Sequence, residues 1–279
     1  MPVRIVTDTA ADLPPSVATS RGIEVVPLTV RFGDESYLSG VELSAEDFWS
    51  KLESSHVAPA TAAPSAGDFQ KAYEKLLSDG ADGIVSIHLS SKLSATFQSA
   101  AVAAKELPSA PVEVFDSLGV SAGLGLLALR AADRAQAGAS ATDIVAELEA
   151  LRPRVRLYGV IDTLEYLRLG GRIGGAQALL GTMLKMKPVI GLQDGVVDPV
   201  GRVRTRAKAL EHLVGLVRAD EGNIQRLVVM HGAAPDVDAF LALLDGVVQV
   251  DPPDVWTLGP IVGAHAGPGV IGVSYITAS

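Results

Sequence analysis

Cysteine is absent from the 279 residues, aromatic residues make up only 5%, and basic residues are fewer than acidic ones. The lack of cysteine excludes disulfides, Cys-ligated zinc and thiol nucleophiles, and it fits a reducing compartment. The formal net charge is −9, from 23 basic and 32 acidic residues. Because phosphate backbones are bound by basic surfaces, this charge argues against a nucleic-acid partner.

Long apolar runs are lacking as well. Residues 1–8 have neither the apolar core nor the small-residue cleavage site of a signal peptide. The longest weakly polar stretch, 119–129, ends at Arg130 and is too short to span a bilayer. These absences predict a soluble, cytoplasmic protein. Aliphatic residues, by contrast, are plentiful, since apolar residues make up 48% and few of them are aromatic.

Strand-like and helix-like segments alternate in the first half of the chain. Apolar runs at 4–7, 83–89 and 112–115 are each followed by a polar turn and a helix-like pattern. This alternation is typical of parallel βαβ units, in which ligands bind beyond the carboxyl ends of the strands. We also predict one extended segment over 23–32 and a loop over 59–64.

The pattern changes near residue 155. A short helix over 163–169 is followed by a glycine-rich break at 170–175. Shorter strands are expected at 188–192, 227–231 and 256–262. We therefore predict an α/β protein of two domains. Residues 1–155 would form a three-layer domain with a parallel sheet, and residues 156–279 a two-layer α/β domain.

One motif matches that of α/β hydrolases. Gly119-Val120-Ser121-Ala122-Gly123 fits the G-x-S-x-G nucleophile elbow, and Asp236 or Asp245 followed by His265 would complete a triad in the right chain order. However, two polar residues separate the predicted strand from the first glycine, and no HGGG-type segment lies upstream. An acyl esterase using Ser121 is therefore the alternative function.

Other cofactor sites are poorly supported. Residues 123–128 fit the G-x-G-x-x-A dinucleotide pattern, but they lie inside a predicted helix whose amides are already hydrogen-bonded. The five histidines are isolated, with no pair at helical spacing that could bind a metal. We expect no metal and no cofactor.

Four short polar segments fall where the predicted fold would gather a ligand. They cover residues 60–65, 89–96, 170–173 and 263–269, and the last is predicted as a tight glycine loop around His265. Together they supply hydroxyl groups, free amides at a helix N-terminus, an arginine and a histidine. This combination suits a single carboxylate.

The sequence resembles the DegV family, which includes the fatty-acid-binding subunits of bacterial fatty acid kinase. The ordered matches run along the whole chain: Val6-Thr7-Asp8-Thr9-Ala10-Ala11-Asp12-Leu13, Thr61-x-x-Pro64-Ser65, Leu93-Ser94-x-Thr96-Phe97-Gln98-Ser99-Ala100, Asp116-Ser117, Leu164-Glu165-Tyr166-Leu167-x-x-Gly170-Gly171-Arg172-Ile173, Lys187-Pro188, Arg204-Thr205 and His265-x-Gly267-Pro268-Gly269. Many matches in the family's order are more specific than any single motif above.

The resemblance implies a fatty acid buried between an N-terminal parallel α/β domain and a C-terminal two-layer domain. It also implies that Thr61, Ser94 with the adjoining Ala95, and His265 bind the carboxylate. Alanine stands at position 95 where the family usually has glycine, so a positive φ there would strain the backbone. Ala62 stands where serine is common, and Ser39-Gly40 replaces the usual Asp-Gly.

The resemblance further implies a kinase partner. Arg172, and Arg202 or Arg204, would face the head group and the docking surface of a separate dihydroxyacetone-kinase-like fatty acid kinase subunit. That ATP-dependent partner would form the acyl phosphate, and lipid could exchange at the membrane surface. A carboxylate is already ionised at neutral pH and needs no base, so this chain itself would be non-catalytic.

Overall fold

A parallel sheet organises the first half of the computed structural model, which describes residues 3–107, 111–247 and 253–278 and leaves aside the side chains of 182–185. Its strands, in spatial order, are β2 (Ile23–Val26), β1 (Val3–Asp8), β6 (Gly83–His88) and β7 (Val112–Asp116). All six residues of β6 are buried. A continuous buried run is typical of a central parallel strand covered on both faces.

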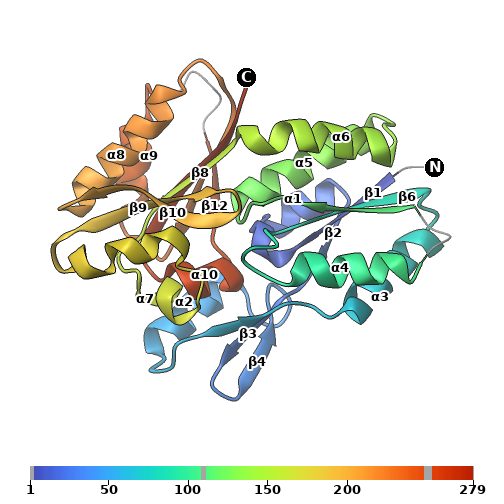
Figure 1. Cartoon of the computed structure of the whole chain (residues 1–279), viewed down its shortest axis with the longest axis horizontal. Helices are drawn as coiled ribbons and strands as arrows, with labels where there is room; N and C mark the ends of the chain where they lie inside the picture. Colours follow the sequence, from blue (N-terminus) through green and yellow to red (C-terminus); the bar gives the residue numbers. More distant parts are fainter. Residues whose placement is uncertain (1–2, 108–110, 248–252, 279) are drawn as a thin grey trace.

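Helices cover both faces of this sheet (Figure 1). On one face lie α3 (Ala66–Ser78) and α4 (Thr96–Lys105), where Phe69 and Tyr73 pack with Val6 and Ile84. On the other face lie α5 (Ala122–Gln136) and α6 (Ala141–Leu151). The short η1 (Thr9–Ala11) and α1 (Pro15–Ser20) connect β1 to β2. The predicted three-layer arrangement is confirmed.

The second half forms a separate mixed sheet after η2 (Arg152–Arg154). Its strands, in spatial order, are β10 (Val196–Val203), β9 (Lys187–Gln193), β8 (Val155–Val160), β13 (Val270–Thr277), β11 (Ile224–Gly232) and β12 (Asp254–Thr257). Helices α8 (Arg206–Ala219) and α9 (Val237–Leu244) cover its outer face. Its inner face meets α5 of the first half, and the predicted α/β class with a parallel sheet and a separate second sheet is confirmed.

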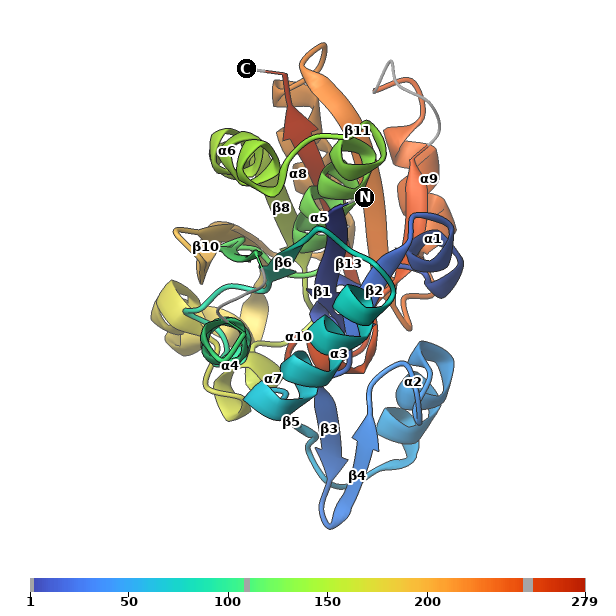
Figure 2. The ribbon, with the colours of Figure 1, turned by 90° about the vertical axis from the view of Figure 1, so that its right-hand side faces the viewer.

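A small antiparallel sheet projects from the parallel sheet in Figures 1 and 2, beside α2 (Ala45–Ser54). It comprises β4 (Glu35–Leu38), β3 (Thr29–Phe32) and β5 (Ala60–Ala62). The prediction of one extended segment over 23–32 is therefore wrong. Pro27 has no N–H to donate, and the Leu28 N–H donates to Thr9 Oγ1 at 3.0 Å instead of to a strand. The predicted loop over 59–64 also contains β5.

The chain following β12 differs from its prediction too. The strand stops at Thr257, and helix α10 (Pro260–Ala266) begins with proline at its first position, where a missing N–H is tolerated. His265 therefore lies in the last turn of a helix and not in a glycine loop. Gly267, at φ +75°, ends that helix.

The remaining helical segments, α7 (Glu165–Leu169) and the 3-10 segment η3 (Gly174–Lys185), connect β8 to β9. In the parts of the chain that the structure describes, no helix has the length and apolar composition to cross a bilayer.

Candidate functional site

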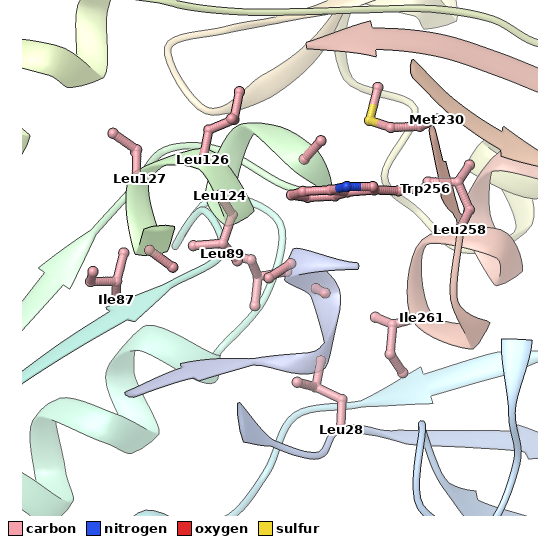
Figure 3. Close-up of a cluster of buried hydrophobic side chains, with 14 of the residues drawn as sticks. Leu28, Ile87, Leu89, Leu124, Leu126, Leu127, Met230, Trp256, Leu258 and Ile261 are labelled. Atoms are coloured by element: carbon pink, nitrogen blue, oxygen red, sulfur yellow. The ribbon is translucent and has the colours of Figure 1, made fainter. Parts of the chain in front are cut away.

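A cavity of about 130 Å³ lies between the two halves of the chain, and residues of both halves line it. Aliphatic side chains form most of its wall. Leu28 and Leu89 come from the first half, and Met230, Leu258 and Ile261 from the second (Figure 3). Such a wall suits a flexible apolar ligand.

Polar side chains from all four predicted segments line this cavity. They are Thr61, Ser94, Arg172 and His265. Thr61 on β5 places its Oγ1 2.9 Å from His265 Nε2, and the Arg172 Nε donates to the carbonyl of Leu93 at 2.9 Å. The structure thus brings together residues that are more than 200 positions apart.

Close packing holds His265 in place. A side chain at Gly170 would put its Cβ 2.1 Å from His265 Nδ1, so only glycine fits there. Burial, with a smaller effect from the positive charge of Arg172, lowers the pKa of His265 to about 4. The imidazole is therefore neutral at pH 7, and Arg172 supplies the positive charge at this end of the cavity. The buried Nδ1 atom has no hydrogen-bond partner among the described residues.

Ser94 lies just before α4. Its Oγ is 2.9 Å from Thr96 Oγ1 and accepts a 3.3 Å hydrogen bond from the Thr96 N–H, which satisfies one amide of the first turn. Ala95 has φ −76°, so the backbone strain considered for alanine at this position does not arise. The Ala95 side chain is exposed and does not line the cavity.

Arg202 and Arg204 lie elsewhere. Both are exposed at the end of β10 and just beyond it, and neither lines the cavity. Neither forms an ion pair within residues 3–107, 111–247 and 253–278.

An ion-pair network that sequence reasoning missed lies near these arginines. Asp162 Oδ1 is 2.8 Å from Lys187 Nζ and 3.1 Å from Arg206 Nη1, and Arg206 also binds Asp236 through two hydrogen bonds of 2.6 and 2.7 Å. Its sequence signal is a weak similarity between Val6-Thr7-Asp8-Thr9 and Val160-Ile161-Asp162-Thr163, because both stretches place an aspartate at or just beyond the end of a strand.

The hydrolase arrangement around Ser121 is not assembled. Its Oγ donates to Asp12 Oδ2 at 2.7 Å and lies 3.2 Å from Met230 Sδ, and no described histidine bonds to it. His265 pairs with Thr61, while Asp236 pairs with Arg206. Ser121 does line the cavity, at φ +53°, but it lacks the base that the esterase alternative requires.

A Ser–His–Asp chain does exist elsewhere in the fold. His88 Nδ1 is 3.0 Å from Asp8 Oδ2, and His88 Nε2 is 2.7 Å from Ser86 Oγ, which in turn accepts from the Tyr73 hydroxyl at 2.8 Å. Asp8, Ser86 and His88 are completely buried between β1, β6 and α3, so no substrate can reach them. The chain satisfies polar groups inside the core.

Comparison with known proteins identifies the family. The family model described as uncharacterised protein, DegV family, matches residues 2–278. This chain belongs to the DegV family. A DegV domain-containing protein of Streptomyces coelicolor is 40% identical over 274 residues, covering 97% of both chains.

Solved structures of DegV proteins share the fold. A DegV family protein from Thermus thermophilus, described by its fatty acid binding, matches at TM-score 0.91 and 38% identity, over 99% of this chain and 100% of that one. DegV from Bacillus subtilis, described as a fatty acid binding protein, matches at TM-score 0.87 and 31% identity, over 99% of both chains. Two solved relatives are thus described as binding fatty acids.

Proposed function

We propose that this DegV protein binds one long-chain fatty acid, with its tail in the cavity and its carboxylate near Thr61, Ser94, Arg172 and His265. The observation that carries the proposal is this group of four polar side chains in a cavity whose wall is mostly apolar. Arg172 offers the charge that a carboxylate requires, and the hydroxyls and imidazole offer hydrogen bonds. Ala95 would contribute only its backbone amide.

The acyl tail supplies most of the affinity in this proposal. Burying a methylene is worth about 0.8 kcal/mol, so a long chain gains on the order of 10 kcal/mol before the ordering costs of binding. The head group then needs only orientation. No catalytic base is required, which agrees with the neutral His265 and the incomplete triad at Ser121.

The binding site is tested by titrating lipid-free protein with a fatty acid. Thr61→Val, Ser94→Ala and His265→Ala should each weaken binding roughly ten- to hundredfold, because hydrogen bonds to a charged group are worth about 1.5–3 kcal/mol. The exposed Thr142, outside the cavity on α6, provides a matched control, and Thr142→Val should bind normally. Unchanged affinity in all three site variants would refute the site.

We further propose that the protein presents its lipid to a separate ATP-dependent kinase subunit, which phosphorylates the carboxylate. Arg202 and Arg204 are exposed and form no ion pair with the residues that the structure describes, which supports a docking surface for an acidic partner. Arg202→Glu with Arg204→Glu should lower acyl-phosphate formation by such a kinase while leaving fatty-acid affinity unchanged. Equal turnover of the double variant and the wild type would rule out docking at these arginines.

A further inference from the structure

We call the cavity proposed to hold the acyl tail the acyl cavity. A second hollow, of about 750 Å³, lies beside it and also between the two halves of the chain. Leu118 and Leu127 of the first half and Val155 and Val200 of the second contribute apolar side chains to it. Charged side chains such as Arg152 line it as well. We call this hollow the distal groove.

The distal groove and the acyl cavity share part of their walls. Leu157, Tyr158, Gly191 and Leu192 border both spaces. Tyr158 on β8 and Gly191 on β9 are register partners, so the shared residues form one short stretch across two strands. Leu157 and Leu192 are only partly buried. The wall between the two spaces is therefore thin and apolar.

This shared wall lies away from the polar end of the cavity. Strand β8 runs toward α7 and the Gly170–Arg172 turn, whose Gly170 packs against His265. Leu157 lies three residues before Val160, the last residue of β8, which is about 10 Å along a strand. An octadecanoate chain spans roughly 22 Å, at roughly 1.3 Å per carbon from a C–C bond of about 1.52 Å. It is long enough to reach the wall from the polar end.

We infer that the acyl cavity is not a closed pocket but continues past Leu157 and Leu192 into the distal groove, which receives the terminal methylenes of fatty acids longer than octadecanoate. This inference rests on the proposed fatty-acid binding. The partly buried Leu157 and Leu192 and the exposed Val200 gain an apolar neighbour when a long chain enters. The substrate class therefore extends to very long acyl chains.

Site-specific labelling tests this inference, because the chain has no native cysteine. Val200→Cys places a single thiol in the distal groove. Val196→Cys is the matched control, since Val196 lies on the same strand with similar exposure (37% against 39%) but lines neither space. Lipid-free protein is loaded with tetradecanoate or docosanoate, loading is verified by mass spectrometry, and the rate of maleimide alkylation is measured.

Docosanoate should slow alkylation of the Val200→Cys protein several-fold relative to tetradecanoate, with no difference for Val196→Cys. Val200→Trp, which fills the groove, should weaken docosanoate binding by about tenfold or more, the loss expected when at least two of the four carbons beyond octadecanoate stay in water. It should leave tetradecanoate binding unchanged. Equal alkylation rates with both lipids loaded, or loading of tetradecanoate alone, would overturn the inference. Failure to load either lipid would instead overturn the proposed function.

Discussion

Asp12 is a buried carboxyl group at the junction of the two halves. Its Oδ1 accepts the Gly259 N–H at 2.8 Å, just before α10, and its Oδ2 accepts the Ser121 hydroxyl at 2.7 Å, just before α5. Burial raises the pKa of Asp12 to about 7, the charge of Asp8 adds to that rise, and the two hydrogen bonds oppose it. Asp12 therefore titrates near neutral pH, unlike an ordinary aspartate.

This shift predicts how stability depends on pH. The folded protein binds the proton more tightly than the unfolded chain, so Asp12 stabilises the fold at low pH and that contribution is lost as pH rises from about 4 through about 7. Between pH 6 and 8, the free energy of unfolding of the wild type should therefore fall by about 1 kcal/mol more than that of Asp12→Asn, at 1.36 kcal/mol per pKa unit.

Urea denaturation at the two pH values measures this difference, and the window lies above the acidic range in which His265 takes up its proton. Asp34→Asn, at an exposed turn, is the control and should keep the wild-type pH dependence. If the free energy of unfolding changed equally between pH 6 and 8 in Asp12→Asn and the wild type, Asp12 would be ionised across that whole range.

Among the elements, α10 determines where His265 lies, and α2 determines where α10 lies. A Cβ at Gly263 would come 2.5 Å from Phe48 Cε1 and 2.9 Å from Trp49, so the two helices are in contact through a glycine. Trp49 Nε1 also donates to the Leu258 carbonyl at 2.9 Å. The position of the imidazole thus depends on a helix outside both large sheets.

Gly263→Ala should therefore displace α10 from α2. We expect a loss of about 1–3 kcal/mol in the free energy of unfolding, the usual cost of overpacking, together with weaker fatty-acid binding. Gly215→Ala on α8 is the matched control, because its added Cβ would meet no atom within 4 Å. That control should be more stable by about 0.5–1 kcal/mol, from helix propensity, and should bind lipid normally. Equal behaviour of the two variants in denaturation and lipid titration would contradict this account.

Sequence patterns predicted the strand–helix alternation well, because a buried strand such as β6 has mostly apolar residues along its length. They failed where one residue redirects the chain. Pro27 moves the end of one apparent strand into another sheet, and Pro260 starts a helix within a β-like run. The gathering of segments 60–65 and 263–269 at one site was expected from the predicted fold, whereas the pairing of Thr61 with His265 could not be predicted, since their contact depends on how the two halves pack.

At the scale of the whole molecule, one hydrophobic cluster joins both halves. It includes Val85 and Leu124 from the first half and Met230 and Ile261 from the second, several of them visible in Figure 3. The acyl cavity is a gap within this shared core, so a bound tail would complete the packing between the halves. A ligand that binds only the folded protein stabilises it by mass action.

Mass spectrometry of the purified protein tests the central claim most directly. Spectra recorded under native and denaturing conditions are compared, and any small molecule released on denaturation is identified. We predict one fatty acid for each chain, lost on denaturation and reduced in the His265→Ala protein. A chain that carries no lipid and also fails to take up added fatty acids would contradict the account.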